Sequence, residues 1–246
     1  MTQMQIIAHR GNSSACHENT MAAFERAVAD GADAIEFDVR LTQDLQWVVH
    51  HDADIVDGAS RVTIRSSPLE NLLRLRVGPN RDAITRLDDF LIWARDQRIG
   101  LVFDIKDKEG MAELVATVER VGFTDPVIYS SFHRSVLKEL EDLRPSWTRG
   151  LIVGDPRSGL ARRFLLNSIV RWSVRHRITS LHLDEHWVVP SALAKMRAAG
   201  FRLAVWTVDD PIRMTMLAAF GIDAVITNRP DLARTTLRSD QLHRQE

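Results

Sequence analysis

The sequence predicts an α/β fold, a TIM-type (β/α)8 barrel with a short β-hairpin and loop insertion after the second strand. Three observations lead to this prediction. The chain has 246 residues, of which 45% are hydrophobic, and single α/β barrels commonly have about this length. Short apolar runs alternate with stretches of helical periodicity, as in βαβ units. The one extra run is explained by a hairpin. We therefore expect residues 1–246 to form a single domain.

Eight apolar runs are predicted to form the parallel strands of the barrel. A ninth run, Gln46–His51, follows the second strand after only residues 40–45. A parallel connection needs about a dozen residues, so this run is expected to return antiparallel as a hairpin. The eight barrel runs are Gln5–His9, Ala34–Val39, Leu101–Ile105, Val127–Ser131, Gly150–Val153, Ser180–Leu183, Leu203–Val208 and Ala224–Thr227.

Helices are expected between the strands. The first covers Met21–Asp30, with Thr20 or Asn19 as its N-cap and Gly31 after its end, because these residue types favour the two helix termini. The same succession of helix, glycine and strand is expected in two later segments, Ser191–Ala199 and Pro211–Phe220.

Two stretches interrupt this alternation. Residues 52–86 are rich in Gly, Ser, Pro and Arg, and are expected to be a loop-rich insertion with one short helix near Leu69–Leu75. The segment Arg157–Arg177 interleaves arginines with apolar residues and predicts a basic amphipathic helix. Such a helix can lie on anionic lipid. A solvated outer helix of the barrel, or a contact between copies of a homo-oligomer, is the favoured interpretation.

Composition excludes several classes of protein. Lys and Arg number 32 against 33 Asp and Glu, so no basic field points to a nucleic-acid partner. A single cysteine, Cys16, excludes an intramolecular disulfide and a Cys-rich zinc site. The sequence shows no signal-peptide pattern and no apolar run of the roughly 18 residues that span a membrane. We therefore expect a cytoplasmic protein without a transmembrane segment.

Polar residues end the predicted strands, and barrel enzymes place their sites at these carboxyl ends. The first strand ends in His9 and Arg10. In the second, Glu36 and Asp38 point to the same side, because side chains alternate along a strand. Two carboxylates so close together favour a site for a hard cation. The alternative is a solvated strand end.

Further candidates follow from the next strands. Asp104 and Lys106 share one face of their strand. They add a third oxygen ligand for a divalent ion and a cation for a phosphate. The hairpin is expected to bring one of His50 and His51 beside the carboxylates. Together with His9, this imidazole could provide general acid and base catalysis.

These motifs, in this order, resemble the glycerophosphodiester phosphodiesterase family. The resemblance rests on His9-Arg10-Gly11, Glu18-Asn19-Thr20, Glu36-x-Asp38-Val39 with Thr42 and Asp44, and His51-Asp52. It continues through Asp104-Ile105-Lys106, Ser131-Phe132, Trp206-Thr207-Val208 and Thr227-Asn228-Arg229-Pro230.

The resemblance implies a TIM-type barrel and a divalent metal ion, Mg²⁺ or Ca²⁺. It assigns the metal to Glu36, Asp38 and Asp104, and the acid–base pair to His9 and His51. The implied reaction cleaves a small-molecule glycerophosphodiester to glycerol 3-phosphate and an alcohol. A neighbouring glycerol hydroxyl can attack first, which would give a cyclic phosphate.

Five further residues receive implied or expected roles. The resemblance implies that Arg10 and Lys106 bind phosphoryl oxygens. Glu18 is then expected to hold Arg10 in place, with Asn19 beside it. Trp206 is expected either to stack on a glycerol or lipid headgroup or to pack within the barrel.

Two departures from the family pattern leave other functions open. Asp104 stands where the family usually has a glutamate, and the segment after Asp52 lacks the usual Leu-x-Arg-Thr-Thr. One alternative is a phosphodiesterase for another diester, such as a lysophospholipid or a sugar-phosphate conjugate. The other is a catalytically weak barrel that binds phosphorylated ligands.

Overall fold

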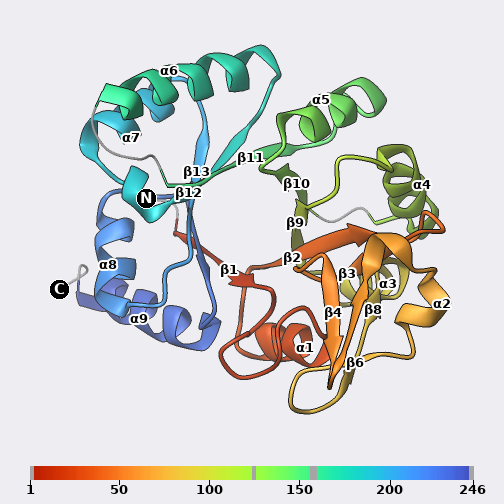
Figure 1. The fold of residues 1–246 in the computed structure, drawn as a ribbon. Helices are drawn as coiled ribbons and strands as arrows, with labels where there is room; N and C mark the ends of the chain where they lie inside the picture. Colours follow the sequence, from red (N-terminus) through yellow and green to blue (C-terminus); the bar gives the residue numbers. More distant parts are fainter. Residues whose placement is uncertain (1–2, 124–125, 156–159, 244–246) are drawn as a thin grey trace.

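The chain folds into a closed barrel of eight parallel strands surrounded by helices, so the predicted TIM-type fold is confirmed (Figure 1). The computed structural model describes residues 3–123, 126–155 and 160–243. Strand β14 pairs with β1, and β1 with β2, which closes the barrel. In spatial order the strands are β1 (Gln5–His9), β2 (Ala34–Leu41), β9 (Gly100–Ile105), β10 (Val127–Ser131), β11 (Arg149–Val153), β12 (Ser180–Asp184), β13 (Arg202–Trp206) and β14 (Ala224–Thr227).

Helices between the strands cover the outside of the barrel (Figure 1). The first begins as expected, since the Thr20 hydroxyl accepts a hydrogen bond from the Ala23 amide at 3.3 Å. Gly11, at a φ of +83°, lets the preceding loop pack on this helix, because a Cβ there would lie 2.6 Å from the Ala23 carbonyl. The outer helices are α1 (Met21–Ala29), α3 (Leu87–Gln97), α4 (Met111–Val121), α5 (Arg134–Leu143), α6 (Leu160–Arg175), α7 (Pro190–Ala198), α8 (Pro211–Ala219) and α9 (Pro230–His243).

The apolar core lies mainly between the barrel strands and this ring of helices. Aromatic rings fill it on one side, where the centroid of Phe37 lies 4.5 Å from those of Phe90 and Phe103. A second cluster, which includes the fully buried Trp187, fills the side near β12 and β13. The interior of the barrel holds smaller apolar side chains, and polar side chains end its strands. This division leaves the barrel mouth free for polar chemistry.

The predicted hairpin is also confirmed. Strand β3 (Trp47–Val49) pairs antiparallel with the end of β2, and Val39 lies opposite Val49. On its other side, β3 pairs with the short strand β8 (Thr85–Arg86). Strand β2 therefore belongs both to the barrel wall and to the hairpin.

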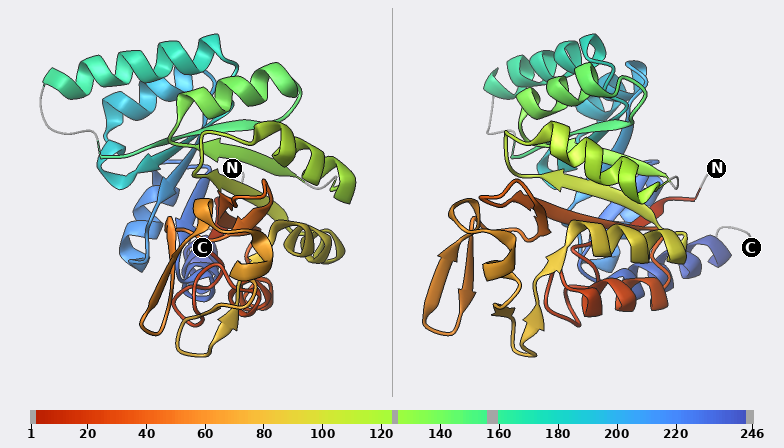
Figure 2. Two further views of the ribbon diagram at one scale, coloured as in Figure 1. Left: turned by 45° about the vertical axis from the view of Figure 1, so that its right-hand side comes forward. Right: turned by 90° about the vertical axis from the view of Figure 1, so that its right-hand side faces the viewer.

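The insertion that follows projects from the end of the barrel at which the strand arrowheads point (Figure 2). It has an apolar cluster of its own, centred on Ile55, Ile64 and Leu72. The helix expected near Leu69–Leu75 is a single turn, Leu69–Leu72, and the two-residue strands were not predicted, because periodicity cannot be detected over such lengths. The elements are β4 (Asp54–Asp57), β5 (Ser60–Thr63), a 3-10 turn (Ile64–Ser66), α2 (Leu69–Leu72), β6 (Arg76–Val77) and β7 (Asp82–Ala83).

The predicted basic helix corresponds to α6, and it ends two residues earlier than expected, at Arg175. Residues 157–159 of the predicted segment lie outside the described residues. Phe164 is 69% exposed on its outer face, as expected for a helix on the outside of the barrel. Among the helices that the structure describes, none combines the length and the apolar character needed to cross a membrane.

Candidate active site

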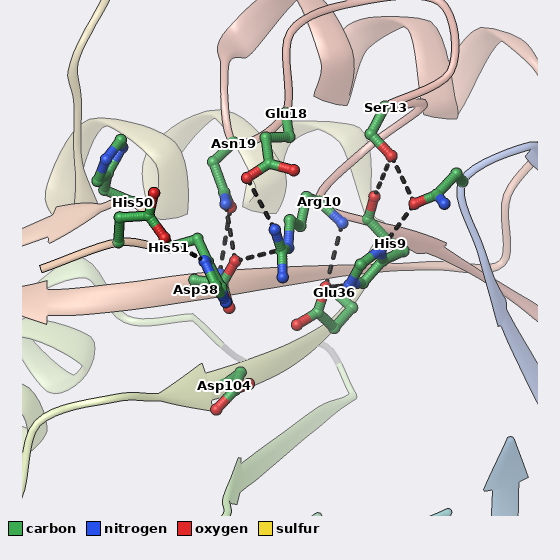
Figure 3. Close-up of polar contacts among 12 residues, drawn as sticks. His9, Arg10, Ser13, Glu18, Asn19, Glu36, Asp38, His50, His51 and Asp104 are labelled. Atoms are coloured by element: carbon green, nitrogen blue, oxygen red, sulfur yellow. Dashed lines mark hydrogen bonds and ion pairs between the residues drawn. The ribbon is translucent and has the colours of Figure 1, made fainter. Parts of the chain in front are cut away.

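Three carboxylates meet at the mouth of the barrel (Figure 3). The register of β2 and β9 places Asp38 directly beside Asp104, and Glu36 lies one position deeper on the same face of β2. Each offers an oxygen atom, and these atoms all lie within 4.8 Å of one another. All three side chains are buried. The alternative of a solvated strand end is therefore wrong, and such a buried cluster requires positive charge nearby.

Two cations face this cluster. Lys106 Nζ lies 2.7 Å from Asp38 Oδ1 and 2.6 Å from Asp104 Oδ2. Arg10 Nε lies 3.0 Å from Asp38 Oδ2, and its Nη1 donates to Glu18 Oε1 at 2.7 Å. The structure thus brings Glu18 against Arg10. With Glu18 included, four carboxylates face two cations, which leaves an excess of negative charge.

The pKa values show where this excess lies. Burial raises the pKa of Glu36 well above its ordinary value, and the charges of Asp38 and Asp104 add to the effect. Burial also raises the pKa of Asp104, to about 6. Burial acts in the same direction on Asp38, but Lys106 and Arg10 outweigh it and hold that pKa low. The two cations therefore stabilise the ionised form of Asp38, and leave Glu36 and Asp104 as the carboxyls that tend to bind a proton instead of carrying the excess charge.

The residues fit a hard divalent cation. Asp104 Oδ1 is buried and has no hydrogen-bond partner among the described residues, and unpaired buried carboxylate oxygens are costly. Mg²⁺ and Ca²⁺ both prefer carboxylate oxygens. A bound divalent ion would supply the missing partner and the missing charge.

His9, at the end of β1, is held in one tautomer by residues that follow β13 and β14, and β14 is the strand that pairs with β1 to close the barrel. Its Nδ1 lies 2.7 Å from Asn228 Oδ1, while Asn228 Nδ2 donates to Asp209 Oδ2 at 2.7 Å. A carboxylate can only accept here, so the Asn228 amide must present its oxygen to His9. Nδ1 therefore carries the hydrogen, and Nε2, 4.0 Å from Glu36 Oε2, is free to accept a proton.

Asn228 and Asp209 were not predicted as site residues. A signal for Asn228 was available, because it directly follows the last strand of the barrel, and closure places that strand beside the first. Burial and the neighbouring Arg10 charge lower the pKa of His9. The imidazole is therefore neutral near pH 7, the state required of a general base.

The hairpin places the two adjacent histidines in different surroundings. His51 lines the cavity at the barrel mouth, and its Nδ1 lies 2.8 Å from Asp52 Oδ1. His50 is more buried, and its Nε2 lies 3.3 Å from the Asp54 carbonyl oxygen. Burial lowers the pKa of His50. The hairpin thus presents one imidazole to the cavity and turns the other toward the insertion.

Most of the predicted site residues line one cavity of about 130 Å³. Its polar half is lined by His9, Arg10, Glu36, His51, Asp104 and Lys106. Of the remaining predicted residues, Trp206 lines the apolar half, Asp38 and Asn19 are buried, and Glu18 pairs with Arg10 with its side chain 39% exposed. Asn19 Nδ2 donates to Asp38 Oδ2 at 2.8 Å.

The apolar half of the cavity comes from strands β10 to β14. Trp206 and Phe132 meet edge to face there, with ring centroids 5.9 Å apart. The indole N–H of Trp206 donates to the His182 carbonyl oxygen at 3.0 Å, which fixes the ring. Phe132 belongs to one of the sequence motifs and His182 to a predicted strand, but neither was predicted to line the site.

Residues 9–232 match the glycerophosphoryl diester phosphodiesterase family. The chain belongs to this family. It is 30% identical over 239 residues to the glycerophosphodiester phosphodiesterase of Caldanaerobacter subterraneus subsp. tengcongensis, covering 92% of this chain and 94% of the relative. It is 28% identical to the probable glycerophosphodiester phosphodiesterase 2 of Mycobacterium tuberculosis, covering 94% of this chain and 89% of that one.

Solved structures of glycerophosphodiester phosphodiesterases have the same fold. The Thermotoga maritima enzyme is 26% identical, with a TM-score of 0.78 and coverage of 94% of this chain and 97% of that chain. An Oleispira antarctica phosphodiesterase in complex with the product sn-glycerol-3-phosphate is 24% identical, with a TM-score of 0.84 and coverage of 96% and 97%. The protein is therefore a phosphoric diester hydrolase of the glycerophosphodiester phosphodiesterase type.

Proposed function

We propose that the protein hydrolyses a glycerophosphodiester to glycerol 3-phosphate and an alcohol in a metal-dependent reaction. The observation that carries the proposal is the meeting of three buried carboxylates, two cations and two imidazoles around one cavity at the barrel mouth. The Oleispira antarctica phosphodiesterase, which shares the fold, binds sn-glycerol-3-phosphate as its product. That ligand supports the same product class here.

Glu36, Asp38 and Asp104 would hold the metal ion, Mg²⁺ or Ca²⁺. When bound, such an ion stabilises negative charge on the phosphoryl oxygens. Lys106 and Arg10 already pair with these carboxylates, yet an ammonium has three donors and a guanidinium has five. Both therefore retain donors for the phosphoryl oxygens of the substrate. Glu18 holds Arg10 in place, and Asn19 orients Asp38.

His9 is assigned the role of general base. Its Nε2 is free because Nδ1 is bound to Asn228, and it takes the proton of the attacking hydroxyl group as the new P–O bond forms. That hydroxyl belongs either to water or to the neighbouring carbon of the glycerol, and in the second case a cyclic phosphate forms and is then opened by water. Either route consumes one water molecule.

His51 is assigned the role of general acid. As the P–O bond to the leaving alcohol breaks, His51 gives a proton to the alkoxide oxygen, while the Asp52 carboxylate, 2.8 Å from Nδ1, holds the ring. The same imidazole accepts a proton when water opens a cyclic phosphate. Trp206 packs against the carbon atoms of the glycerol in the apolar half of the cavity.

The decisive test is turnover by the purified protein with Mg²⁺ or Ca²⁺. We expect release of glycerol 3-phosphate from glycerophosphocholine or glycerophosphoethanolamine, and loss of this activity with EDTA. Lysophosphatidylcholine and bis(p-nitrophenyl) phosphate in the same panel identify a different diester preference. If no diester is cleaved in a metal-dependent manner, the proposal is wrong and the barrel only binds phosphorylated ligands.

We place this reaction in the cytoplasm, and the support for this is the single free cysteine, Cys16, which suits a reducing compartment. Contact with a lipid surface and homo-oligomerisation stay predictions that rest on the basic helix α6. Size-exclusion chromatography with light scattering and vesicle sedimentation test the two separately.

A further inference from the structure

One polar side chain in the apolar half of the cavity lacks a hydrogen-bond partner in the described part of the chain. His182, in the middle of β12, is 1% exposed, and its imidazole lines the cavity. Its Nε2 is buried and makes no hydrogen bond to any described residue. An unsatisfied buried nitrogen of this kind is costly to leave unpaired. It therefore calls for a partner that comes from outside the chain.

The surrounding barrel makes room for this ring without satisfying it. Gly150, on the neighbouring strand β11, has no side chain, and a Cβ there would lie 3.1 Å from His182 Nε2. Ser130 is close to the same point, but its hydroxyl donates to the Phe103 carbonyl. On the other side, β12 pairs His182 with the small Ala204. The small neighbours thus let the ring pack closely against the strands, and none of the described residues pairs with its Nε2.

The partner must approach from the barrel mouth. On the opposite side of His182, toward the amino-terminal ends of the strands, the space is about 10 Å³, which is at or below the room that a single water needs. The cavity on the mouth side is about 130 Å³ and also contains the candidate catalytic groups. A ligand bound at those groups can therefore extend to His182.

The chemistry of this partner follows from the state of the ring. Burial lowers the pKa of His182 to about 4, so the imidazole is neutral near pH 7 and offers one donor and one acceptor. A neutral imidazole pairs well with a hydroxyl group, which can also both donate and accept. The apolar walls formed by Phe132, Trp206 and Ile226 suit the carbon atoms that carry such a hydroxyl.

We propose that His182 is a hydroxyl-recognition residue, whose unpartnered imidazole nitrogen binds a hydroxyl of the polyol part of the substrate while the polar half of the cavity binds the phosphate. This inference rests on the proposed function and deepens it. The residue selects phosphodiesters with a polyol over those with a plain alkyl chain. Sites that hydrogen-bond a hydroxyl discriminate strongly against analogues that lack it.

The test compares the binding of two ligands in the presence of Mg²⁺, by calorimetry. Wild-type protein should bind sn-glycerol 3-phosphate at least about tenfold more tightly than n-propyl phosphate, which lacks the hydroxyls. His182→Leu should reduce this preference to below about threefold, with little change for propyl phosphate. Ser180→Ala, which removes a buried hydroxyl two residues away on the same strand at the closed end, is the matched control and should keep the preference.

Two results would overturn the inference: a preference that survives in His182→Leu, or an equal loss for both ligands, which would mean that the ring only supports the fold. If the leucine variant does not fold, selective ¹⁵N-histidine NMR of the wild type decides instead. The His182 nitrogen resonances should then move on addition of glycerol 3-phosphate and not of propyl phosphate, and unchanged resonances reject the inference.

This test can fail independently of the proposed function. Binding requires no turnover, so a protein that cleaves no diester but loses its preference in His182→Leu would refute the function and support the inference. A protein that cleaves glycerophosphocholine but keeps its ligand preference in His182→Leu would support the proposed function and refute the inference. Absence of any glycerol 3-phosphate binding by the wild type would refute the inference.

Discussion

Asn19 and Asp38 hold each other through two hydrogen bonds at the rim of the barrel. Asn19 Nδ2 donates to Asp38 Oδ2 at 2.8 Å, and the Asp38 backbone N–H donates to Asn19 Oδ1 at 3.2 Å. Both residues are buried, and Asn19 adopts a left-handed φ of 57°. The loop after β1 thereby sets the orientation of a carboxylate on β2, and leaves Asp38 Oδ1 facing Lys106.

Replacing this amide should weaken metal binding. In Asn19→Ala the Asp38 N–H loses its acceptor, and the Asp38 carboxylate loses one of its hydrogen-bond donors. We therefore expect about tenfold weaker Mg²⁺ or Ca²⁺ affinity by calorimetry. The free energy of unfolding should fall by about 1–3 kcal/mol. Asn19→Gly is the matched control, because it removes the same amide but tolerates the left-handed backbone. It should lose metal affinity equally and stability less. Unchanged metal affinity in both variants would contradict the role of Asn19.

Removing one carboxylate tests the metal site itself. Asp104→Asn lowers the charge of the cluster at the residue whose Oδ1 has no partner, so turnover should fall about a hundredfold or more. Calcium or magnesium binding should weaken in parallel. Asp107→Asn, whose carboxylate accepts the Leu41 N–H at 2.8 Å outside the cluster, is the control. A loss no greater than that of the control would remove Asp104 from the site.

The adjacent histidines of the hairpin allow a direct comparison of two imidazoles. His51→Ala should lower kcat by about 10²–10⁴-fold, the range for loss of a general acid or base, and should leave metal affinity within a factor of two or three. His50→Ala, which loses only the contact with the Asp54 carbonyl, should reduce kcat far less. Steady-state kinetics on glycerophosphocholine measures both, and equal effects would refute the assignment of His51.

His9→Ala should lower kcat as strongly as His51→Ala, again without loss of metal binding. The physical reason is that in the proposed reaction its Nε2, which the Nδ1 contact with Asn228 leaves free, takes the proton of the attacking hydroxyl. Calorimetry of metal binding and steady-state kinetics on the same preparation separate the two effects. Retained turnover in His9→Ala would exclude His9 as the base.

His182 should also make stability depend on pH. Its pKa is lowered from 6.5 to about 4 in the folded protein, so the unfolded chain binds a proton at a higher pH than the folded chain does. Its contribution is fully present above pH 6.5 and is lost as the pH falls to about 4. The difference corresponds to about 3 kcal/mol.

Urea unfolding of wild type and His182→Leu at pH 7.5 and pH 4.5 measures this contribution. The unfolding free energy of the wild type should fall relative to that of the variant by about 2.5 kcal/mol between the two pH values, somewhat less than the full linkage. A difference between the two proteins that does not change with pH would show that the buried imidazole does not titrate as inferred.

The barrel and most of the site could be predicted because both depend on local patterns. Apolar runs mark the strands, and Glu36, Asp38 and Asp104 lie on two of them, so the parallel pairing of β2 with β9 brings them together. The link from His9 to Asn228 and Asp209 could not be predicted in this way, because it joins side chains that meet only across the closing pair of strands. His182 was not predicted as a site residue, because the role that we propose for it rests on an Nε2 without a partner among the described residues, which no motif reveals.

Strand β2 has a structural consequence beyond the barrel. Its first residues pair with β1 and β9, its last residues pair with β3, and the His50 amide donates to the Asp38 carbonyl at 3.0 Å. This continuous strand therefore fixes the spacing between the acidic cluster and the hairpin imidazole. A slip of one residue would reverse every side chain on it, whereas a Cβ added at Gly58, in the tip of the insertion between β4 and β5, would meet no atom within 4 Å. The distances needed for phosphate chemistry are therefore set within this one strand and its hairpin, and none of the described residues that line the cavity comes from the outer insertion at 52–86.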